Sequence, residues 1–317
     1  MKTLLLLLLI SLQNFAQKSD TTAIITGINR VCLSVADLEK SIVFYENTIG
    51  LEVLNRQEIK QQIPSEKAAK IIHKNRKAAT LKFPNGQIEL MQFEGVNPNA
   101  QSKMPVQGSG ITHVCYQSPM TNSIYEKSKK NGAKIVSRGE KPIDRGYGIL
   151  YAYIKDNDNI MFENEEFEKP KFTENVWLGH VALVTHDIDR LVNFYTQLLD
   201  SKPINRKDNI KNNPKLDDIA NIDSLELRGA WFQVGNMLLE IWQFDSPKTM
   251  PNEKPNSYTE IGYQKIVFDV KNLEKVNENS LKKGIEFLSK PVINIKTVEV
   301  FLRDPDGNLL LLHEKLL

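Results

Sequence analysis

Histidine and glutamate side chains occur in strand-like stretches of this sequence whose other residues are mostly apolar. His180 lies in "GHVALV" and Glu240 lies in "LLEIWQF". Side chains of these types bind metal ions and transfer protons. A single histidine in a strand is more often a hydrogen-bonded core residue, however, and a single glutamate is often a charge at a strand edge. The choice between these interpretations depends on the elements that position the side chains.

The stretch around His180 occurs twice in the chain. Residues 28–56 and 178–206 align without a gap at an offset of 150, and Arg30 stands where the second copy has His180. Each copy predicts a strand, a helix that starts near an aspartate and ends in Phe-Tyr, and a second strand. Each copy then continues through a polar insert to a strand pair, "ATLKFPNGQIELMQF" in the first and "AWFQVGNMLLEIWQF" in the second.

Two further units follow the same order less closely. Residues 110–163 run from "GITHVCYQS" to "GILYAYIKDNDNIMFE", and residues 262–312 run from "GYQKIVFDV" to "TVEVFLRDPDGNLLLL". Asn-Gly, Gly-Asn and Asp-Gly pairs fall where tight hairpins need positive φ angles. The chain is therefore predicted to contain four units, each with one strand, one helix and three further strands.

These four units, the Phe-Tyr helix ends and the closing "DPDGN" resemble the vicinal oxygen chelate superfamily, which includes glyoxalase I, extradiol dioxygenases, bleomycin- and fosfomycin-resistance proteins and methylmalonyl-CoA epimerase. The resemblance implies an α+β fold in which βαβββ modules pair to form two curved-sheet cups. It divides the chain into a domain over residues 24–168, with modules 24–95 and 109–168, and a domain over residues 174–317, with modules 174–245 and 260–317.

The resemblance also implies where a metal would bind, because ligands in this superfamily come from the first and last strands of each module. Alternation with a period of two keeps such side chains on one face of the sheet. In module order, the corresponding positions are Arg30 and Glu89, His113 and Glu163, His180 and Glu240, and Lys265 and Leu311.

Two module pairings are open, and they distribute these positions differently. If module one pairs with two and three with four, neither cup has a full ligand set. If two pairs with three and one with four, one cup has two histidines and two glutamates, and the other keeps a single ligand. We infer the second pairing, and it predicts one metal site made of His113, Glu163, His180 and Glu240.

Two histidines and two glutamates suit one divalent metal ion, such as Zn, Ni, Co, Mn or Fe(II). The resemblance to the glyoxalase I branch favours a lyase or isomerase that transfers a proton on a small vicinal-oxygen substrate, with Glu163 or Glu240 as the base. One alternative is an Fe(II) ring-cleaving dioxygenase. The other is a protein that binds its ligand without a metal. The "DRGYG" stretch, residues 144–148, is either a segment that closes over a ligand or a plain hairpin loop.

Composition, charge and the N-terminal segment indicate which partners the protein has and where it is located. The chain has 317 residues, of which 41% are hydrophobic, and its net charge of +2 is spread without blocks of one sign. This composition favours a small-molecule substrate over nucleic acid or a membrane as partner. Four modules in one chain could form both cups, so a monomer is possible. Residues 1–17 resemble a signal peptide, which predicts periplasmic or secreted protein after cleavage. Cys32 and Cys115 are expected to be small buried residues, and His313 is expected outside the cups.

Overall fold

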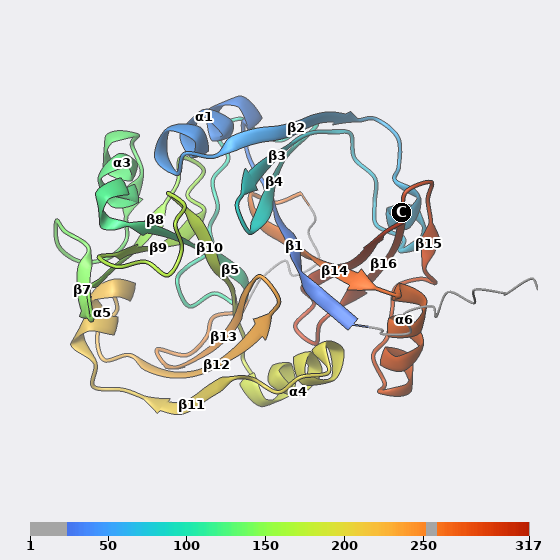
Figure 1. The fold of residues 1–317 in the computed structure, drawn as a ribbon. Coiled ribbons are helices and arrows are strands. Elements are labelled where there is room, and N and C mark those ends of the chain that lie inside the picture. The colour runs from blue at the N-terminus through green and yellow to red at the C-terminus, as the bar shows by residue number, and fades with distance from the viewer. Residues whose placement is uncertain (1–23, 252–258, 317) are drawn as a thin grey trace, which may run out of the picture.

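The computed structural model describes residues 24–251 and 259–316, whose strands form two curved sheets (Figure 1). The fold is α+β, as the sequence predicts, and each sheet is open rather than closed into a barrel. Among the described helices, none combines the length and hydropathy needed to cross a membrane. The predicted signal peptide, residues 1–17, lies outside the described residues.

One sheet combines modules one and four in the strand order β15-β16-β17-β14-β1-β4-β3-β2. Its strands are β1 (Ile24–Ser34), β2 (Glu52–Ile59), β3 (Arg76–Phe83), β4 (Gly86–Phe93), β14 (Gly262–Lys271), β15 (Val292–Ile293), β16 (Thr297–Arg303) and β17 (Leu309–Lys315). We call its concave side, which contains Arg30 and Lys265, the Arg–Lys cup.

The other sheet combines modules two and three in the order β11-β12-β13-β10-β5-β9-β8-β6, with β7 paired to β8. Its strands are β5 (Gly110–Pro119), β6 (Lys134–Ile135), β7 (Ile143–Gly146), β8 (Ile149–Lys155), β9 (Met161–Phe167), β10 (Trp177–Val184), β11 (Asn205–Ile210), β12 (Glu226–Val234) and β13 (Met237–Ser246). We call its concave side, which contains His113 and His180, the His–Glu cup.

The modules therefore pair in the exchanged way that the ligand positions predict. Strand β5 of module two runs antiparallel to β10 of module three, with Val114 opposite Val181. Strand β1 of module one runs antiparallel to β14 of module four in the same manner, with Val31 opposite Ile266. Each cup thus takes one module from each half of the chain.

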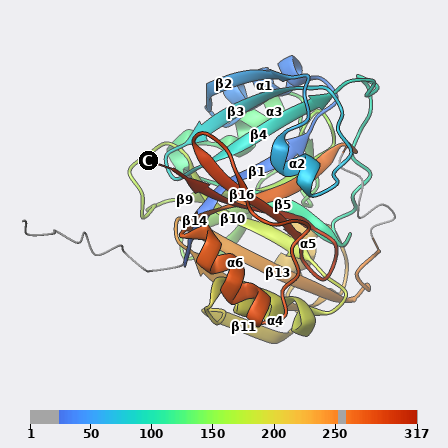
Figure 2. The same cartoon turned by 90° about the vertical axis from the view of Figure 1, so that its right-hand side faces the viewer.

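Each module has one helix that packs on the side of its sheet away from the cup, into the core that the two sheets share. These helices are α1 (Leu38–Thr48), α3 (Ile124–Lys130), α4 (Ile188–Leu199) and α6 (Leu273–Lys282), and a 3-10 turn precedes α3 at Met120–Asn122. Asp37 and Asp187 cap α1 and α4 by accepting hydrogen bonds from backbone N–H groups of the first turn. Figure 2 shows α4 and α6 next to each other, and Lys283 at the end of α6 pairs with Asp200 at the end of α4 at 2.6 Å.

The repeated Phe-Tyr at the helix ends joins modules of different sheets. Tyr45 at the end of α1 donates a hydrogen bond to Asp156 of module two at 2.9 Å. Tyr195 near the end of α4 donates the equivalent bond to Asp304 of module four at 3.1 Å. Both tyrosines are buried, so each bond lies inside the protein, where a lost partner is costly. The repeated motif therefore connects two modules that are consecutive along the chain but belong to different sheets.

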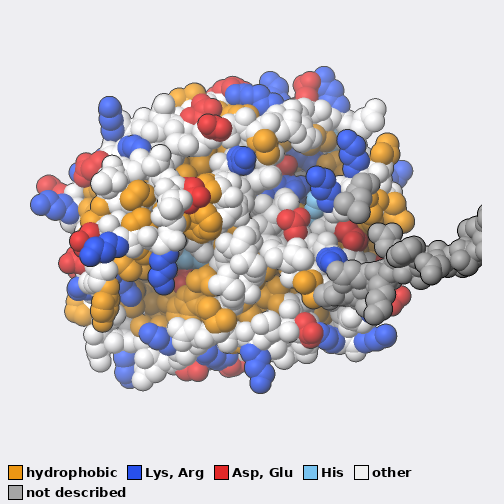
Figure 3. All heavy atoms as spheres, viewed as in Figure 1, with side chains coloured by type: hydrophobic (Ala, Val, Ile, Leu, Met, Phe, Trp, Pro, Cys, Tyr) orange, Lys and Arg blue, Asp and Glu red, His pale blue; other side chains and the backbone are white. Residues whose placement is uncertain are grey.

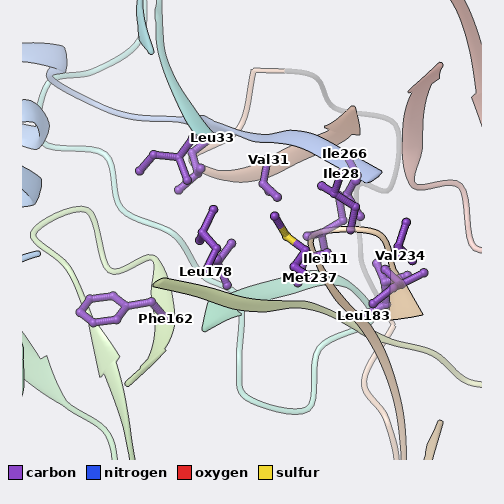
Figure 4. Close-up of a cluster of buried hydrophobic side chains, with 14 of the residues drawn as sticks. Ile28, Val31, Leu33, Ile111, Phe162, Leu178, Leu183, Val234, Met237 and Ile266 are labelled. Carbon is purple, nitrogen blue, oxygen red and sulfur yellow. The ribbon is translucent and has the colours of Figure 1, made fainter. Parts of the chain in front are cut away.

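The main hydrophobic core lies between the two sheets. Figure 4 shows Val31 and Leu33 of β1 facing Leu178 and Met237 of the other sheet, and all four side chains are at most 3% exposed. Burying one such side chain stabilises the fold by about 1.5–3 kcal/mol. The sheets share this core, and the two cups open on opposite sides of it (Figure 1).

Candidate metal centre

The four predicted ligands come from four strands of the same sheet. His113 lies on β5, Glu163 on β9, His180 on β10 and Glu240 on β13. The parallel pairing of β5 with β9 places Glu163 beside Cys115, two residues after His113. The pairing of β10 with β13 places Glu240 beside Ala182, two residues after His180. The two modules therefore present their histidine and glutamate with the same register.

The ligand atoms converge at one point in the His–Glu cup. The Nε2 atoms of His113 and His180 are 3.4 Å apart. A carboxylate oxygen of Glu240 is 3.1 Å from His180 Nε2 and 3.9 Å from His113 Nε2. Oxygens of Glu163 are 3.5 Å from His113 Nε2 and 3.8 Å from His180 Nε2. All four side chains are at most 8% exposed.

The protonation equilibria of this cluster reflect its burial. Burial lowers the pKa of His113 to about 4, although Glu240 and Glu165 act in the opposite direction. The imidazole is therefore neutral near pH 7 and has a lone pair to donate to a metal. Burial also raises the pKa of Glu163 to about 8, with His180 opposing the rise and the nearby carboxylates adding to it.

Neighbouring side chains hold two of these ligands in place. Trp231 on β12 lies opposite Glu240 and donates from Nε1 to its Oε1 at 2.5 Å. Thr112 Oγ1 lies 3.1 Å from His113 Nδ1, so the hydroxyl is within hydrogen-bonding distance of the ring nitrogen that faces away from the cluster. The Tyr153 ring packs 5.2 Å from the His113 ring. Such supporting contacts fix the orientation of metal ligands.

The chemistry of the cluster fits a divalent cation. Oε2 of Glu240 is buried and accepts no hydrogen bond from the described residues, although His180 Nε2 lies 3.1 Å from it. Within residues 24–251 and 259–316, no lysine or arginine forms an ion pair with Glu163 or Glu240. Two buried carboxylates without a cation are costly, and a divalent ion bound by two neutral imidazoles and two carboxylates would neutralise them.

The Arg–Lys cup has different side chains at the positions equivalent to the four candidate ligands. Glu89 lies 3.7 Å from the Arg30 guanidinium and 3.9 Å from the Lys265 ammonium, and Cys32 Sγ donates to it at 3.2 Å. Burial acts to raise the pKa of Glu89, but the charges of Arg30 and Lys265 outweigh it and lower the pKa to about 2. Leu311 fills the remaining position as part of an apolar cluster. Two fixed positive charges therefore stand where this cup would need metal ligands.

The expectation that His313 lies outside the cups is wrong about the face of the sheet. His313 is two residues from Leu311 on β17, and residues two apart on a strand point to the same face, here the concave one. His313 Nδ1 is 3.3 Å from Asp269 Oδ1.

The helix α5 (Pro214–Ala220) covers part of the His–Glu cup. A cavity of about 40 Å³ lies beneath it, lined by His113, Tyr153 and Trp242 together with apolar side chains that include Ile219. Ser137 Oγ donates to the Ile219 carbonyl at 2.7 Å. On the face shown in Figure 3, apolar side chains gather in a band over β12 and β13, the strands that form this side of the cup.

Helix α2 (Pro64–Ala68) has the same relation to the other cup. Pro64 and Pro214 are 150 residues apart, as the repeat requires. Glu66 of α2 forms a buried ion pair with Arg76 at 2.6 Å. Ile71, just after α2, packs into the apolar cluster with Leu311. Helix α2 is thus anchored by a buried ion pair, whereas Arg138 contacts Asp218 of α5 and the exposed Asp223 just beyond it at the protein surface.

The chain belongs to the Glyoxalase/Bleomycin resistance protein/Dioxygenase superfamily, whose family model matches residues 27–164 and 177–312. Glyoxalase I from Zea mays has a similar structure, with a TM-score of 0.63 and 21% identity over 91% of this chain and 92% of that chain. A putative dioxygenase from Bacillus subtilis subsp. subtilis str. 168 gives a TM-score of 0.58 and 12% identity over 93% of this chain and 86% of that chain. At these identities, the likeness shows the shared fold alone.

One curated relative is similar in sequence. The ethylmalonyl-CoA/methylmalonyl-CoA epimerase of Cereibacter sphaeroides is 28% identical over 141 residues, which are 44% of this chain and 96% of the relative. One half of the present chain therefore corresponds to the whole of that protein.

Proposed function

We propose that this protein is a divalent-metal-dependent enzyme that transfers a proton on a small substrate with two neighbouring oxygens. The observation that carries the proposal is the convergence of His113, Glu163, His180 and Glu240 in one buried cluster. Within the described part of the chain, Oε2 of Glu240 accepts no hydrogen bond. The similarity to an epimerase supports proton transfer at carbon as the type of reaction.

The two glutamates have different surroundings, and we assign them different roles. Glu240 is fixed at Oε1 by the indole N–H of Trp231, so its orientation is restrained. The Cys115 thiol, a weak donor, lies within 4.8 Å of the carboxylates of both Glu163 and Glu165, so Glu163 has no comparable restraint among the described residues. Glu163 is therefore the carboxylate that removes the proton from a substrate carbon and returns it. A bound divalent ion would supply Lewis acidity at the substrate oxygens.

The interior of the His–Glu cup limits the size of the substrate part that it accepts. The cavity beside His113 holds about 40 Å³, and apolar side chains, including those of α5 and β13, line most of it. A short apolar substituent fits this space, and a larger one requires α5 to move. The Tyr153 and Trp242 rings in the cavity wall favour an apolar group over a charged one at this end of the cup.

Hydrogen exchange tests the proposal directly. The protein loaded with each candidate metal is incubated in deuterated water with hydroxyacetone, glycolaldehyde or lactaldehyde, and deuterium at the carbon next to the carbonyl is followed by NMR. We expect exchange above the uncatalysed rate in the wild type and its loss in Glu163→Gln. Glu89→Gln changes the equivalent residue of the other cup and should retain exchange. Absence of exchange in metal-loaded wild type with all three probes would contradict the proposal.

One feature of the site supports an Fe(II) dioxygenase as a second candidate. Donor atoms of His113, Glu163 and His180 all lie within 4.8 Å of one another, and two histidines with one carboxylate are the ligand type of many non-haem iron oxygenases. Oxygen uptake with catechol by anaerobically iron-loaded protein separates the candidates, because proton transfer consumes no oxygen.

Export is a separate proposal that rests on the sequence of residues 1–17 alone. Intact mass measurement of protein recovered from the periplasm or medium of an expressing bacterium would test it. A mature chain that begins near residue 17 is expected, and full-length protein confined to the cytoplasm would contradict export.

A further inference from the structure

An arginine that pairs with no carboxylate of the described residues lies on the wall of the His–Glu cup. Arg145 belongs to β7, which forms a hairpin with β8. Gly146 and Gly148 have positive φ angles, and Tyr147 between them is fully exposed at the turn. The "DRGYG" stretch is thus a hairpin, and its arginine lies next to the turn.

The register of the sheet shows which face Arg145 occupies. In the pairing of β8 with β9, Tyr153 lies opposite Glu163 and Tyr151 lies opposite Glu165. Directly opposed residues in a sheet share a face, so both tyrosines face the cup together with Glu163. The Arg145 guanidinium carbon lies 5.3 Å from the centre of the Tyr151 ring. Arg145 is therefore on the concave side, about one two-residue step, or roughly 7 Å, along the strand from the tyrosine that packs on His113.

The guanidinium has positive charge that nothing within the described residues balances directly. Its Nη1 atom is buried and has no hydrogen-bond partner, and Arg145 forms no ion pair within residues 24–251 and 259–316. Glu165, which lies opposite Tyr151 on β9, already accepts a hydrogen bond from Gln117 at 2.5 Å. Stacking on Tyr151 holds the guanidinium while leaving its N–H groups free to donate.

We propose that Arg145 binds an anionic group of the substrate, a carboxylate or a phosphate, while the vicinal oxygens of the same molecule bind at the His–Glu cluster. This proposal rests on the proposed function and narrows its substrate to small anionic molecules. The planar guanidinium matches either anion with two parallel hydrogen bonds, and a buried unpaired N–H is stabilised by acquiring an acceptor. The substrate would then have its anionic end toward Tyr151 and a short apolar part in the cavity beneath α5.

A matched pair of ligands tests this assignment by binding rather than by turnover. 2-Hydroxyglutarate and 2-hydroxypentanoate share a five-carbon chain and the same hydroxy-acid end, and only the first has a second carboxylate. Their affinities for manganese-loaded protein are measured by isothermal titration calorimetry in the wild type, Arg145→Gln, Arg145→Lys and Arg206→Gln. Arg206 is a suitable control because it lies on the same sheet but pairs with Asp189 and Asp208.

We expect the wild type to bind 2-hydroxyglutarate at least tenfold more tightly than 2-hydroxypentanoate. Arg145→Gln should remove this preference, Arg145→Lys should retain part of it, and Arg206→Gln should leave it unchanged. Equal affinities in the wild type, no binding of either acid, or a preference that survives in Arg145→Gln would overturn the proposal. Manganese content and hydrogen exchange are measured on the same samples, so a failed anion site remains distinguishable from a failed metal site.

Discussion

Glu89 and Glu240 occupy equivalent strand positions in the two cups, and their replacement by glutamine should have opposite consequences. Glu89 contacts the cations Arg30 and Lys265, whereas Glu240 faces two histidines and a second carboxylate. Glutamine keeps the size of the side chain and removes the charge. We predict that Glu89→Gln loses stability and keeps the metal, and that Glu240→Gln loses the metal and keeps the stability of the metal-free protein.

The size of the first effect follows from the pKa of Glu89. Its two cationic neighbours overcome the effect of burial and lower this pKa from 4.5 to about 2. A tenfold change in acidity corresponds to about 1.4 kcal/mol, so the ionised carboxylate stabilises the fold by about 3 kcal/mol at pH 7. This value agrees with the cost of about 3–5 kcal/mol for removing one partner of a buried ion pair.

The same shift fixes the pH range of the effect. Because the folded-state pKa lies below the unfolded value, the stabilisation is complete above about pH 4.5 and disappears as the pH falls toward 2. About half of the difference between wild type and Glu89→Gln should remain at pH 3.

Urea unfolding in the presence of EDTA, followed by circular dichroism, measures both variants without the contribution of bound metal. We expect Glu89→Gln to lose about 3 kcal/mol of unfolding free energy at pH 7, and Glu240→Gln to match or exceed the wild type, because it removes one of several buried carboxylates. A loss below about 1 kcal/mol in Glu89→Gln, or equal losses in both variants, would refute the assignment of the two cups.

Three further predictions concern the surroundings of the cups. Trp231→Phe removes the hydrogen bond to Glu240 and should weaken metal affinity about 10–100-fold. Competition with a chelating dye measures this affinity, and an unchanged value would show that the indole does not support Glu240. Arg138→Ala removes the contacts to Asp218 and Asp223 and should speed proteolytic cleavage near α5. An unchanged cleavage rate would show that these contacts do not hold α5 in place. Neither Cys32 nor Cys115 should react with a thiol reagent in the native protein, because both are fully buried and burial raises the pKa of Cys32 to about 12. Two thiols should react after unfolding, and a rapid reaction in the native protein would contradict this burial.

The architecture could be predicted from the sequence because it depends on repeated patterns, and the four candidate ligand positions came from the resemblance to the superfamily applied to those repeats. The offset of 150 between the copies aligned Arg30 with His180, and the distribution of ligand types then favoured one module pairing. The structure has this pairing, with β5 beside β10 and β1 beside β14.

The supporting residues could not be predicted in the same way. Trp231 reaches Glu240 from the adjacent strand, and this contact depends on the register of β12 against β13. Arg145 faces the cup because β7 folds onto β8, a pairing that no repeated pattern indicated. Such contacts are set by strand register, which a single sequence specifies only weakly when neither strand of the pair has a clear alternation.

Metal content tests the central claim most directly. Elemental analysis of the purified protein, after reconstitution with each candidate ion, is compared among the wild type, His180→Ala and Arg30→Ala, which change equivalent positions of the two cups. We expect about one equivalent per chain in the wild type and in Arg30→Ala, and a loss of bound metal in His180→Ala. Two equivalents in the wild type, metal retained in His180→Ala, or no metal in any form would contradict a single centre in the His–Glu cup.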